Sequence, residues 1–307
     1  MLSIHRSVLL KEVLEYLNPK SGENFIDCTF GGGGHSLEIL KRIQPNGKLL
    51  GIDANQDIEK EIKKLSSFAK ATADRKIKWF KNFIFVNDNF KNLKNIVKNN
   101  FKKDLKVAGI LLDLGLSSDE LEKSGRGFSF QKDEPLDMRF DVRQEKTASN
   151  ILNFYSIKKL YDVFKTFGNC SCASQLSKNI FQQRRLKKIE TTQDLVKLIL
   201  QIDSHKGKLH PATKIFQALR IEVNDELDNL VKVLSQAIEI LQPGGRLVVI
   251  SFHSLEDRIV KNFFRELGKC ENKILNILTK KPVAPSFEEI KNNPRSRSAK
   301  MRAIEKI

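Results

Sequence analysis

The stretch Asn24-Phe-Ile-Asp-Cys-Thr-Phe-Gly-Gly-Gly-Gly-His-Ser36, followed by Lys48-Leu-Leu-Gly-Ile-Asp53, decides the fold of this chain. The apolar pair before the glycines predicts a strand that ends in a tight turn. Ser36 is a helix-capping residue type, and the apolar residues after it share one helical side: Leu37, Leu40 and Ile43. A second strand then ends at Asp53, about 20 residues past the glycines, where a βαβ nucleotide site places an acid on the ribose.

The glycine loop Gly31 to Gly34 is suited to bring the backbone close to a ligand. Glycine has no side chain to keep a ligand away, and it adopts the positive φ that such turns often require. The loop therefore predicts an adenosine-containing ligand, with a merely tight turn between strand and helix as the alternative. Glycines alone do not separate NAD from S-adenosylmethionine.

The charge balance indicates a polyanionic partner. The chain has 307 residues, enough for one large or two modest domains. Lys+Arg number 54 and Asp+Glu 37, so the net charge is +17 and the pI is near 9.6. Such an excess favours nucleic acid as the partner, and a lysine-rich bias of the proteome is the alternative.

The rest of the composition favours a cytoplasmic protein without a metal site. No apolar run approaches the roughly 20 residues of a membrane span, and residues 1–6 lead into no signal-peptide hydrophobic region. Cysteines occur at positions 28, 170, 172 and 270, in neither a zinc spacing nor a disulfide framework. We therefore expect free thiols in a reducing compartment.

Further strand ends are expected to meet the glycine loop. The apolar segments 83–86 and 107–112 predict two more strands, which lead to Phe90 and Asp113. Ligands bind outside the carboxyl ends of parallel strands. Asp27, Asp53, Phe90 and Asp113 should therefore converge on one crevice, although Phe90 is equally suited to core packing.

The alternation of strands and helices stops between residues 117 and 209, where helical patterns follow a loop-like segment. We interpret 117–209 as an inserted helical domain for substrate recognition. Residues 1–116 and 210–307 then form the domain with the sheet. Within the insert, Gln182-Gln-Arg-Arg-Leu-Lys-Lys188 is a basic cluster, and Thr191 with Asp194 predicts a capping box.

One long helix is predicted after His210, with an apolar face formed by Phe216, Leu219, Val223, Leu227 and Leu230. Amide and guanidinium side chains share the opposite stripe, which consists of Thr213, Gln217, Arg220 and Asn224. This stripe indicates a contact surface. A polar seam between the two domains is the alternative.

The last third of the chain distinguishes between the possible ligands. The turn Gln242-Pro-Gly-Gly245 before a buried strand is similar to that of class I methyltransferases and favours S-adenosylmethionine. His253, just past this strand, is either a functional residue or a turn residue, and Ser254 with Asp257 predicts a second capping box. Asn293-Pro-Arg-Ser-Arg-Ser-Ala-Lys300 alternates guanidinium and hydroxyl groups, which bind phosphates, unless it is a solvated loop.

Several motifs together resemble one family, the bacterial 16S ribosomal RNA cytosine-N4 methyltransferases. They occur in order along almost the whole chain: Asp27 to Ser36, Asp113-Leu-Gly-Leu-Ser-Ser118, Gly127-Phe-Ser-Phe130, Pro135-Leu-Asp-Met-Arg139, His210-Pro-Ala-Thr213, Phe216 to Ile221, Ser251 to Asp257 and Asn293 to Arg297. The resemblance implies a class I, Rossmann-like α/β fold with a mostly parallel sheet. It also implies methyl transfer from S-adenosylmethionine to N4 of a decoding-site cytidine in 16S rRNA of the small ribosomal subunit.

The resemblance also implies roles for single residues. Positions that match cofactor ligands of the family are Gly33, Gly34, His35, Asp53, Phe90 and Asp113. Glu120 stands where the family usually has Gln, which alters a cofactor contact, and Gly168-Asn-Cys-Ser-Cys172 replaces a Gly-Glu-Glu motif. The residues assigned to the RNA substrate are Asp137, Arg139, Arg220, Asn224, His253, Arg295 and Arg297.

The reaction needs a group that accepts a proton from the cytosine amine. Asp113 is the candidate catalytic residue, since a carboxylate aimed at the amine hydrogens localises the nitrogen lone pair. The base-stacking candidates are Phe128, Phe130 and Phe252. Rival functions are a non-catalytic RNA-binding factor with a vestigial cofactor site and an NAD-dependent oxidoreductase. A homodimer is compatible with the sequence.

Overall fold

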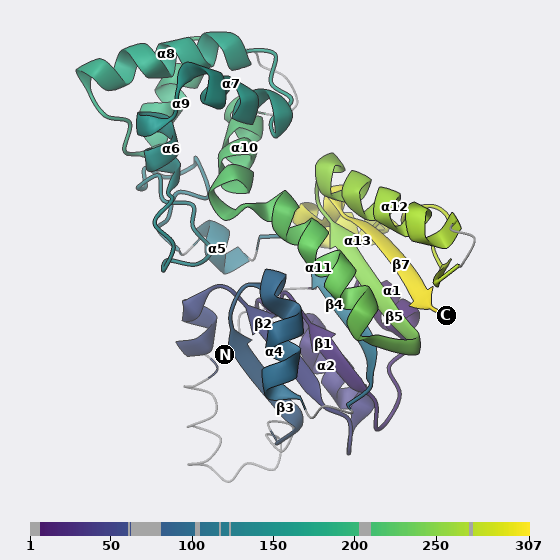
Figure 1. The fold of residues 1–307 in the computed structure, drawn as a ribbon. Coiled ribbons are helices and arrows are strands. Elements are labelled where there is room, and N and C mark those ends of the chain that lie inside the picture. Colours follow the sequence, from purple (N-terminus) through teal and green to yellow (C-terminus); the bar gives the residue numbers. More distant parts are fainter. Residues whose placement is uncertain are drawn as a thin grey trace. The chain divides into compact units, whose positions relative to one another are not determined.

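The computed structural model describes residues 7–60, 62, 81–101, 105–116, 118–122, 124–202, 210–269 and 273–307. It divides into a first unit, Met1–Gly115 with Leu227–Ile307, and a second unit, Leu116–Glu226 (Figure 1). The expectations for residues 1–6, Ser117 and Cys270 lie outside the described residues. Among the described helices, none has both the length and the apolar character needed to cross a membrane.

The described part of the first unit contains a seven-stranded sheet in the order β3-β2-β1-β4-β5-β7-β6. Its strands are β1 (Asn24–Asp27), β2 (Leu49–Asp53), β3 (Phe83–Asn87), β4 (Val107–Asp113), β5 (Leu241–Ser251), β6 (Leu275–Ile277) and β7 (Lys300–Lys306). The first five are parallel, and β7 runs antiparallel to both of its neighbours. The predicted Rossmann-like, mostly parallel sheet is confirmed.

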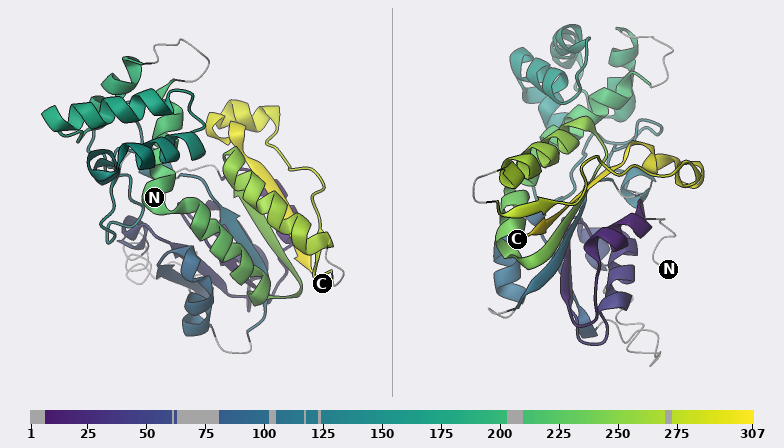
Figure 2. Two further views of the ribbon diagram at one scale, coloured as in Figure 1. Left: turned by 45° about the horizontal axis from the view of Figure 1, so that its top comes forward. Right: turned by 90° about the vertical axis from the view of Figure 1, so that its right-hand side faces the viewer.

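Helices cover both faces of this sheet (Figure 2). One face packs against α1 (Leu10–Leu17) and α2 (Gly34–Ile43), and the other against α4 (Leu93–Asn100), α11 (Glu226–Ile240) and α12 (Ser254–Lys269). The apolar run of β4 explains the arrangement, because Ile110 and Leu112 point into one core cluster and Leu111 into the other. The remaining short elements are η2 (Phe90–Asn92), α13 (Phe287–Asn292) and η3 (Pro294–Ser298).

The last strand of the sheet was not expected from the sequence. β7 carries Lys, Arg and Glu and lies in a basic tail, yet it is paired on both sides. Met301 and Ala303 enter one core cluster, and Ile304 enters the other. Arg302 is buried, and an ion pair with Asp257 compensates its charge, with Nε of Arg302 2.7 Å from Oδ1 of Asp257.

The second unit is helical, as predicted for the insert. Its described helices are α5 (Ser118–Glu122), α6 (Ala148–Phe154), α7 (Ile157–Thr166), α8 (Ala173–Leu186), α9 (Thr192–Leu200) and α10 (Ala212–Asn224). The capping box of Thr191 and Asp194 is present at the start of α9. The unit extends beyond the expected limit at residue 209, because Ile215, Phe216 and Leu219 of α10 belong to its core.

The single long helix expected after His210 is wrong. The chain breaks at Asp225, whose φ of 49° is left-handed, so that α10 and α11 are separate helices. The two helices bury their apolar residues in different cores. Val223 of α10 packs in the second unit, whereas Leu230 of α11 packs against the sheet of the first.

Candidate active site

The candidate site lies at the carboxyl edge of the parallel strands in the first unit. In the sheet register, Asp27 is opposite Gly51 and Leu111, and Asp53 is opposite Asn87. Asp113 ends β4 beside β5. The sheet thus brings the predicted acids, Asp27, Asp53 and Asp113, to the same edge.

The glycine loop forms the turn from β1 into α2. Gly33 has a φ of 74°, and a Cβ built on it would lie 2.8 Å from Cζ of Phe30. It is also the N-cap of α2, so the prediction that Ser36 caps this helix is wrong. Because the first N–H groups of a helix have no partner within it, those of Gly34 and His35 are directed out of the start of α2.

Ser36 instead forms part of a buried network beneath the loop. Its hydroxyl donates to Oδ2 of Asp27 at 2.7 Å, and the Thr29 backbone N–H donates to Oδ1 at 3.1 Å. The Thr29 hydroxyl in turn accepts from the backbone N–H of Asp113 at 2.7 Å. Asp27 is 1% exposed, and burial raises the pKa of its carboxyl. Asp27 therefore holds the loop and β4 together.

Asp53 joins the end of β2 to the glycine loop. Its Oδ2 accepts from the backbone N–H of Gly31 at 2.8 Å, and its Oδ1 accepts from that of Asn55 at 2.9 Å. The Asn87 amide donates to the Asp53 carbonyl at 2.9 Å. An acid at this position binds the ribose hydroxyls in βαβ nucleotide sites, and this role stays a prediction for Asp53.

Phe90 begins η2, just past the end of β3. Its ring is partly buried and packs against the core cluster that contains Leu93 and Ile96. Core packing, one of its two expected roles, is therefore present. Its role in covering an adenine stays a prediction.

His35 and Asp113 face each other across the start of α2. The buried His35 ring lies with Nε2 2.9 Å from the Val8 carbonyl, which only accepts, so Nε2 carries the hydrogen. Nδ1 lies 3.6 Å from Oδ2 of Asp113. Because Nε2 carries the hydrogen toward Val8, Nδ1 attracts the Asp113 carboxylate only when the imidazole is protonated. A ligand contact at His35 falls to its backbone N–H.

Asp113 has an acceptor oxygen to spare. Among the described residues, its buried Oδ1 has no hydrogen-bond partner. Burial raises the pKa of the Asp113 carboxyl to about 6, an effect that His35 opposes and that the charges of Asp27 and Glu256 reinforce. Asp113 therefore still ionises below neutral pH and offers one unsatisfied oxygen at the strand edge.

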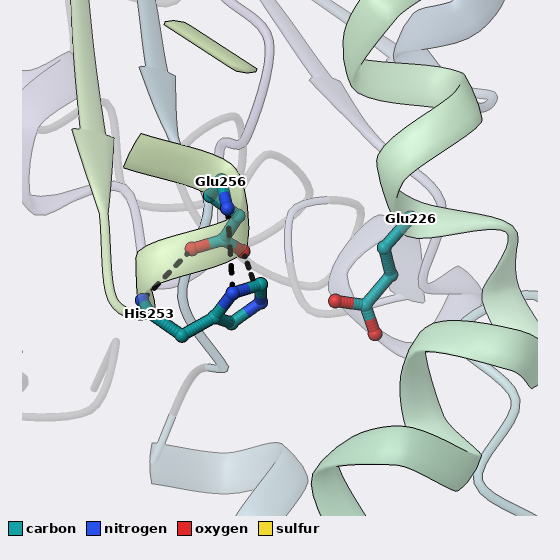
Figure 3. A group of neighbouring side chains, drawn as sticks. All are labelled: Glu226, His253 and Glu256. Carbon is teal, nitrogen blue, oxygen red and sulfur yellow. Dashed lines mark hydrogen bonds and ion pairs between the residues drawn. The ribbon is translucent and has the colours of Figure 1, made fainter. Parts of the chain in front are cut away.

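Glu256, which sequence analysis missed, completes the end of β5 (Figure 3). Its Oε2 accepts from the backbone N–H groups of Phe252 and His253, at 2.8 and 3.2 Å. In return, Nδ1 of the His253 ring accepts from the Glu256 N–H at 3.4 Å. Nε2 of His253 lies 3.1 Å from Oε1 of Glu256. The predicted capping box of Ser254 with Asp257 is therefore wrong by one residue, because the pair that caps α12 is His253 with Glu256. The sequence feature that could have indicated this pair is an acid three residues after His253.

The residues assigned to the substrate in the second unit form local contacts. The Arg139 guanidinium donates two hydrogen bonds to the Asp137 carboxylate, from Nε to Oδ1 at 2.8 Å and from Nη2 to Oδ2 at 2.7 Å. Partial burial acts to raise the pKa of Asp137, but hydrogen bonds from Arg139 outweigh it and lower the pKa. Arg220 pairs with Glu226, the third residue drawn in Figure 3, at 2.8 and 2.9 Å.

Asn224 and Glu120 are buried in the same unit. The Asn224 side chain accepts from the Phe140 N–H at 2.8 Å and donates to the Met138 carbonyl at 2.8 Å. Asn224 thereby fixes the loop that carries Asp137. The polar stripe of α10 thus makes contacts within the second unit. The direct substrate contacts of Arg220 and Asn224, and the cofactor contact of Glu120, stay predictions.

Arg295 and Arg297 lie on η3 of the first unit, where both are exposed. Ser296 between them is buried, and its hydroxyl donates to the Asn293 carbonyl at 2.8 Å. Within this Arg-Ser-Arg sequence, the two arginine side chains therefore face outward and the Ser296 side chain faces inward. Phosphate contacts by Arg295 and Arg297 stay a prediction, whereas the buried Ser296 hydroxyl is not available for one.

The three candidate base-stacking aromatics differ in access. Phe128 is buried and stacks on Phe140, with ring centroids 5.5 Å apart. Phe130 is partly buried and stacks on the exposed His210 ring at 4.7 Å. Phe252 packs on Gly115, where a Cβ would lie 2.7 Å from its ring. Phe130 and Phe252 retain some exposed surface.

One expectation about the cysteines is wrong. Cys170 and Cys172 form a disulfide in the turn between α7 and α8, whereas Cys28 is a buried free thiol, as expected. The chain turns at Asn169, just before Cys170, with a φ of 44°, and the Cα atoms of Cys170 and Cys172 lie 5.3 Å apart. Spacing alone gave no sign of this turn.

Comparison with known proteins agrees with this architecture. Residues 2–307 match the model of the MraW methylase family. The chain is 46% identical, over 99% of both sequences, to a protein of Sulfurihydrogenibium sp. (strain YO3AOP1) called ribosomal RNA small subunit methyltransferase H. Proteins of the same name from Carboxydothermus hydrogenoformans and Clostridioides difficile are 43% and 41% identical, each aligned over 99% of this chain. The chain therefore belongs to the MraW methylase family.

Proposed function

We propose that this protein transfers the methyl group of S-adenosylmethionine to the N4 amine of a decoding-site cytidine in 16S rRNA, within the small ribosomal subunit. The observation that carries the proposal is the free oxygen of Asp113, a carboxylate acceptor at the strand edge beside the glycine loop. Its support also comes from the family and from relatives named as ribosomal RNA small subunit methyltransferases.

The residues at the strand edge fit this cofactor. Gly33 supplies the positive φ that this turn requires, and the N–H groups at the start of α2 suit a carboxylate. Asp53 ends β2, where βαβ nucleotide sites place the acid that binds the ribose, and Phe90 lies one strand further along the edge. S-adenosylmethionine supplies an electrophilic methyl group when bound.

The protein's main task is to hold the amine in line with that methyl group and to receive its proton. Orientation alone removes a large part of the barrier of a two-reactant step. The N4 lone pair is delocalised into the cytosine ring, so an acceptor directed at an amine hydrogen strengthens the nucleophile. Asp113 Oδ1 is such an acceptor, and the Thr29 hydroxyl holds the backbone of Asp113 in place.

The decisive experiment incubates the purified protein with labelled S-adenosylmethionine and small subunits from a strain that lacks the corresponding gene. We expect label in N4-methylcytidine, located by mass-spectrometric mapping of the rRNA. Label in another nucleoside would show that the target is misassigned, and absence of label from every RNA tested would favour a non-catalytic RNA-binding factor. Calorimetric titration with S-adenosylmethionine and then NAD tests the oxidoreductase alternative.

A further inference from the structure

A basic surface lies at the end of α8 in the second unit, and the proposed reaction does not use it. Residues 173–188 contain no Asp or Glu, and their cations are Lys178, Arg184, Arg185, Lys187 and Lys188. Cations near a helix C-terminus are favourable because of the helix dipole. Charge alone therefore does not indicate a ligand, and the contacts of each cation must be considered.

Arg184 is a structural member of this surface. Its guanidinium lies over the Phe181 ring, with Cζ 4.8 Å from the centroid. Its Nη1 donates to the carbonyls of Leu152 and Tyr155, at 3.0 and 2.7 Å. Arg184 thereby ties the last turn of α8 to the chain at the end of α6.

Arg185 and Lys188, in contrast, keep their donors for a ligand. Arg185 is exposed and lies over the same Phe181 ring, with Cζ 4.6 Å from the centroid. Within the described part of the chain, neither Arg185 nor Lys188 forms an ion pair, whereas Lys187 lies 3.1 Å from Asp194. Stacking on Phe181 orients the Arg185 plane without using its hydrogen-bond donors.

Two large apolar side chains near this end of α8 are exposed. Phe154 is 70% exposed and Leu186 is 85% exposed. Phe154 stands between Leu152 and Tyr155, the residues whose carbonyls Arg184 binds, so it adjoins the end of α8. Single exposed apolar residues are common, but an exposed aromatic beside free cations is the arrangement that binds single-stranded nucleic acid.

We propose that Phe154, Phe181, Arg185, Leu186 and Lys188, the α8 surface, bind an unpaired segment of RNA. Arg185 and Lys188 contact its phosphates, and a base stacks on the Phe154 ring. RNA fits better than an acidic peptide because the aromatic ring offers a platform for a planar base. This inference rests on the proposed function only in taking RNA as the polyanion.

The test measures binding of the full-length protein to a labelled, unstructured RNA oligonucleotide and to a duplex of the same sequence, over a range of salt concentrations. Phe154→Leu keeps an apolar side chain but loses the ring, and should weaken single-strand binding about tenfold with little change in salt dependence. Arg185→Gln should flatten the log-log salt dependence by about 0.7. Lys165→Gln is the matched control, since exposed Lys165 ends α7 at the opposite end of the α7–α8 pair.

The inference is overturned if Phe154→Leu and Arg185→Gln both bind RNA as the wild type does. It is also overturned if Lys165→Gln flattens the salt dependence as much as Arg185→Gln, or if Phe154→Leu weakens duplex and single-strand binding equally. Affinity for S-adenosylmethionine, measured in parallel, should stay unchanged and shows that each variant is folded. Because the readout is binding rather than methyl transfer, failure here is separate from failure of the proposed function.

Discussion

Asp113 combines an unsatisfied oxygen with a pKa raised to about 6, mainly because of burial. The proton acceptor must be ionised, so we expect the single-turnover methylation rate to fall as the pH drops through about 6. Asp113→Asn keeps the size and one acceptor oxygen but removes the charge, and should lower this rate more than the cofactor affinity. If saturating S-adenosylmethionine restores the wild-type rate, Asp113 is a cofactor ligand only.

The same residue makes a separate prediction for stability. In the unfolded chain its carboxyl ionises near pH 4, so the folded state binds the proton more tightly. The stabilising contribution of Asp113 is therefore present below pH 4 and is lost as the pH rises through about 6. Asp113→Asn should melt at a higher temperature than the wild type at pH 8, and the two melting temperatures should converge near pH 4 in thermal unfolding followed by circular dichroism.

Asp53 is predicted to bind cofactor hydroxyls while it holds the glycine loop through Gly31. Asp53→Ala should weaken cofactor binding by about 1.5 to 3 kcal/mol, the scale of hydrogen bonds to a charged acceptor. Asp53→Asn, which keeps one acceptor oxygen for the loop, should lose less. Calorimetric titration with S-adenosylmethionine measures both, and wild-type affinity in folded Asp53→Ala would remove Asp53 from the site.

The acids of the site could be predicted because each ends an apolar strand, and strand ends meet at one edge of a parallel sheet. Glu256 could not be found in the same way, because its role depends on where α12 begins. The predicted capping box, Ser254 with Asp257, lay one residue too late in the sequence. Ser36 was misassigned because a contact outside the helix competes with the predicted cap. Its hydroxyl finds a nearer partner in Asp27, across the turn, than in the helix that it was expected to cap.

The turn from β1 to α2 requires glycine for two separable reasons. Gly33 has a positive φ, and a Cβ on it would meet the Phe30 ring. Gly22 has a φ of +85° and nothing within 4 Å of a built Cβ, so it provides a control for backbone strain alone. Gly22→Ala should cost about 1 to 2 kcal/mol of unfolding free energy. Gly33→Ala should cost more and also weaken cofactor binding, as chemical denaturation and calorimetry would show.

Elements with a continuous apolar pattern were predictable, and those whose pattern is mixed were not. β4 is apolar along nearly its whole length and is buried on both faces, as expected. β7 mixes charged and apolar residues, and its place inside the sheet depends on partners far away in the sequence, such as Asp257 for Arg302. Likewise, the apolar pattern of α10 continues into α11 without interruption at residue 225, so the sequence pattern does not show that the two helices pack in different cores.

At the scale of the whole molecule, the net charge of +17 predicts RNA binding that weakens steeply with salt. Arg295 and Arg297 are exposed on η3, and each phosphate contact that they make should contribute about 0.7 to the log-log slope for single-stranded RNA. Replacing both by Gln should flatten that slope by up to about 1.4 in titrations from low to physiological salt. An unchanged slope would show that η3 makes no phosphate contact.

The antiparallel β7 also affects the order in which the sheet can assemble during synthesis. It lies between β5 and β6, yet among the described strands it is the last that the ribosome makes. Until it emerges, β5 and β6 each present an unpaired edge, which invites pairing with another chain. A nascent chain interrupted between residues 278 and 299 would carry both open edges, so premature termination here should give aggregation-prone products rather than a smaller folded domain.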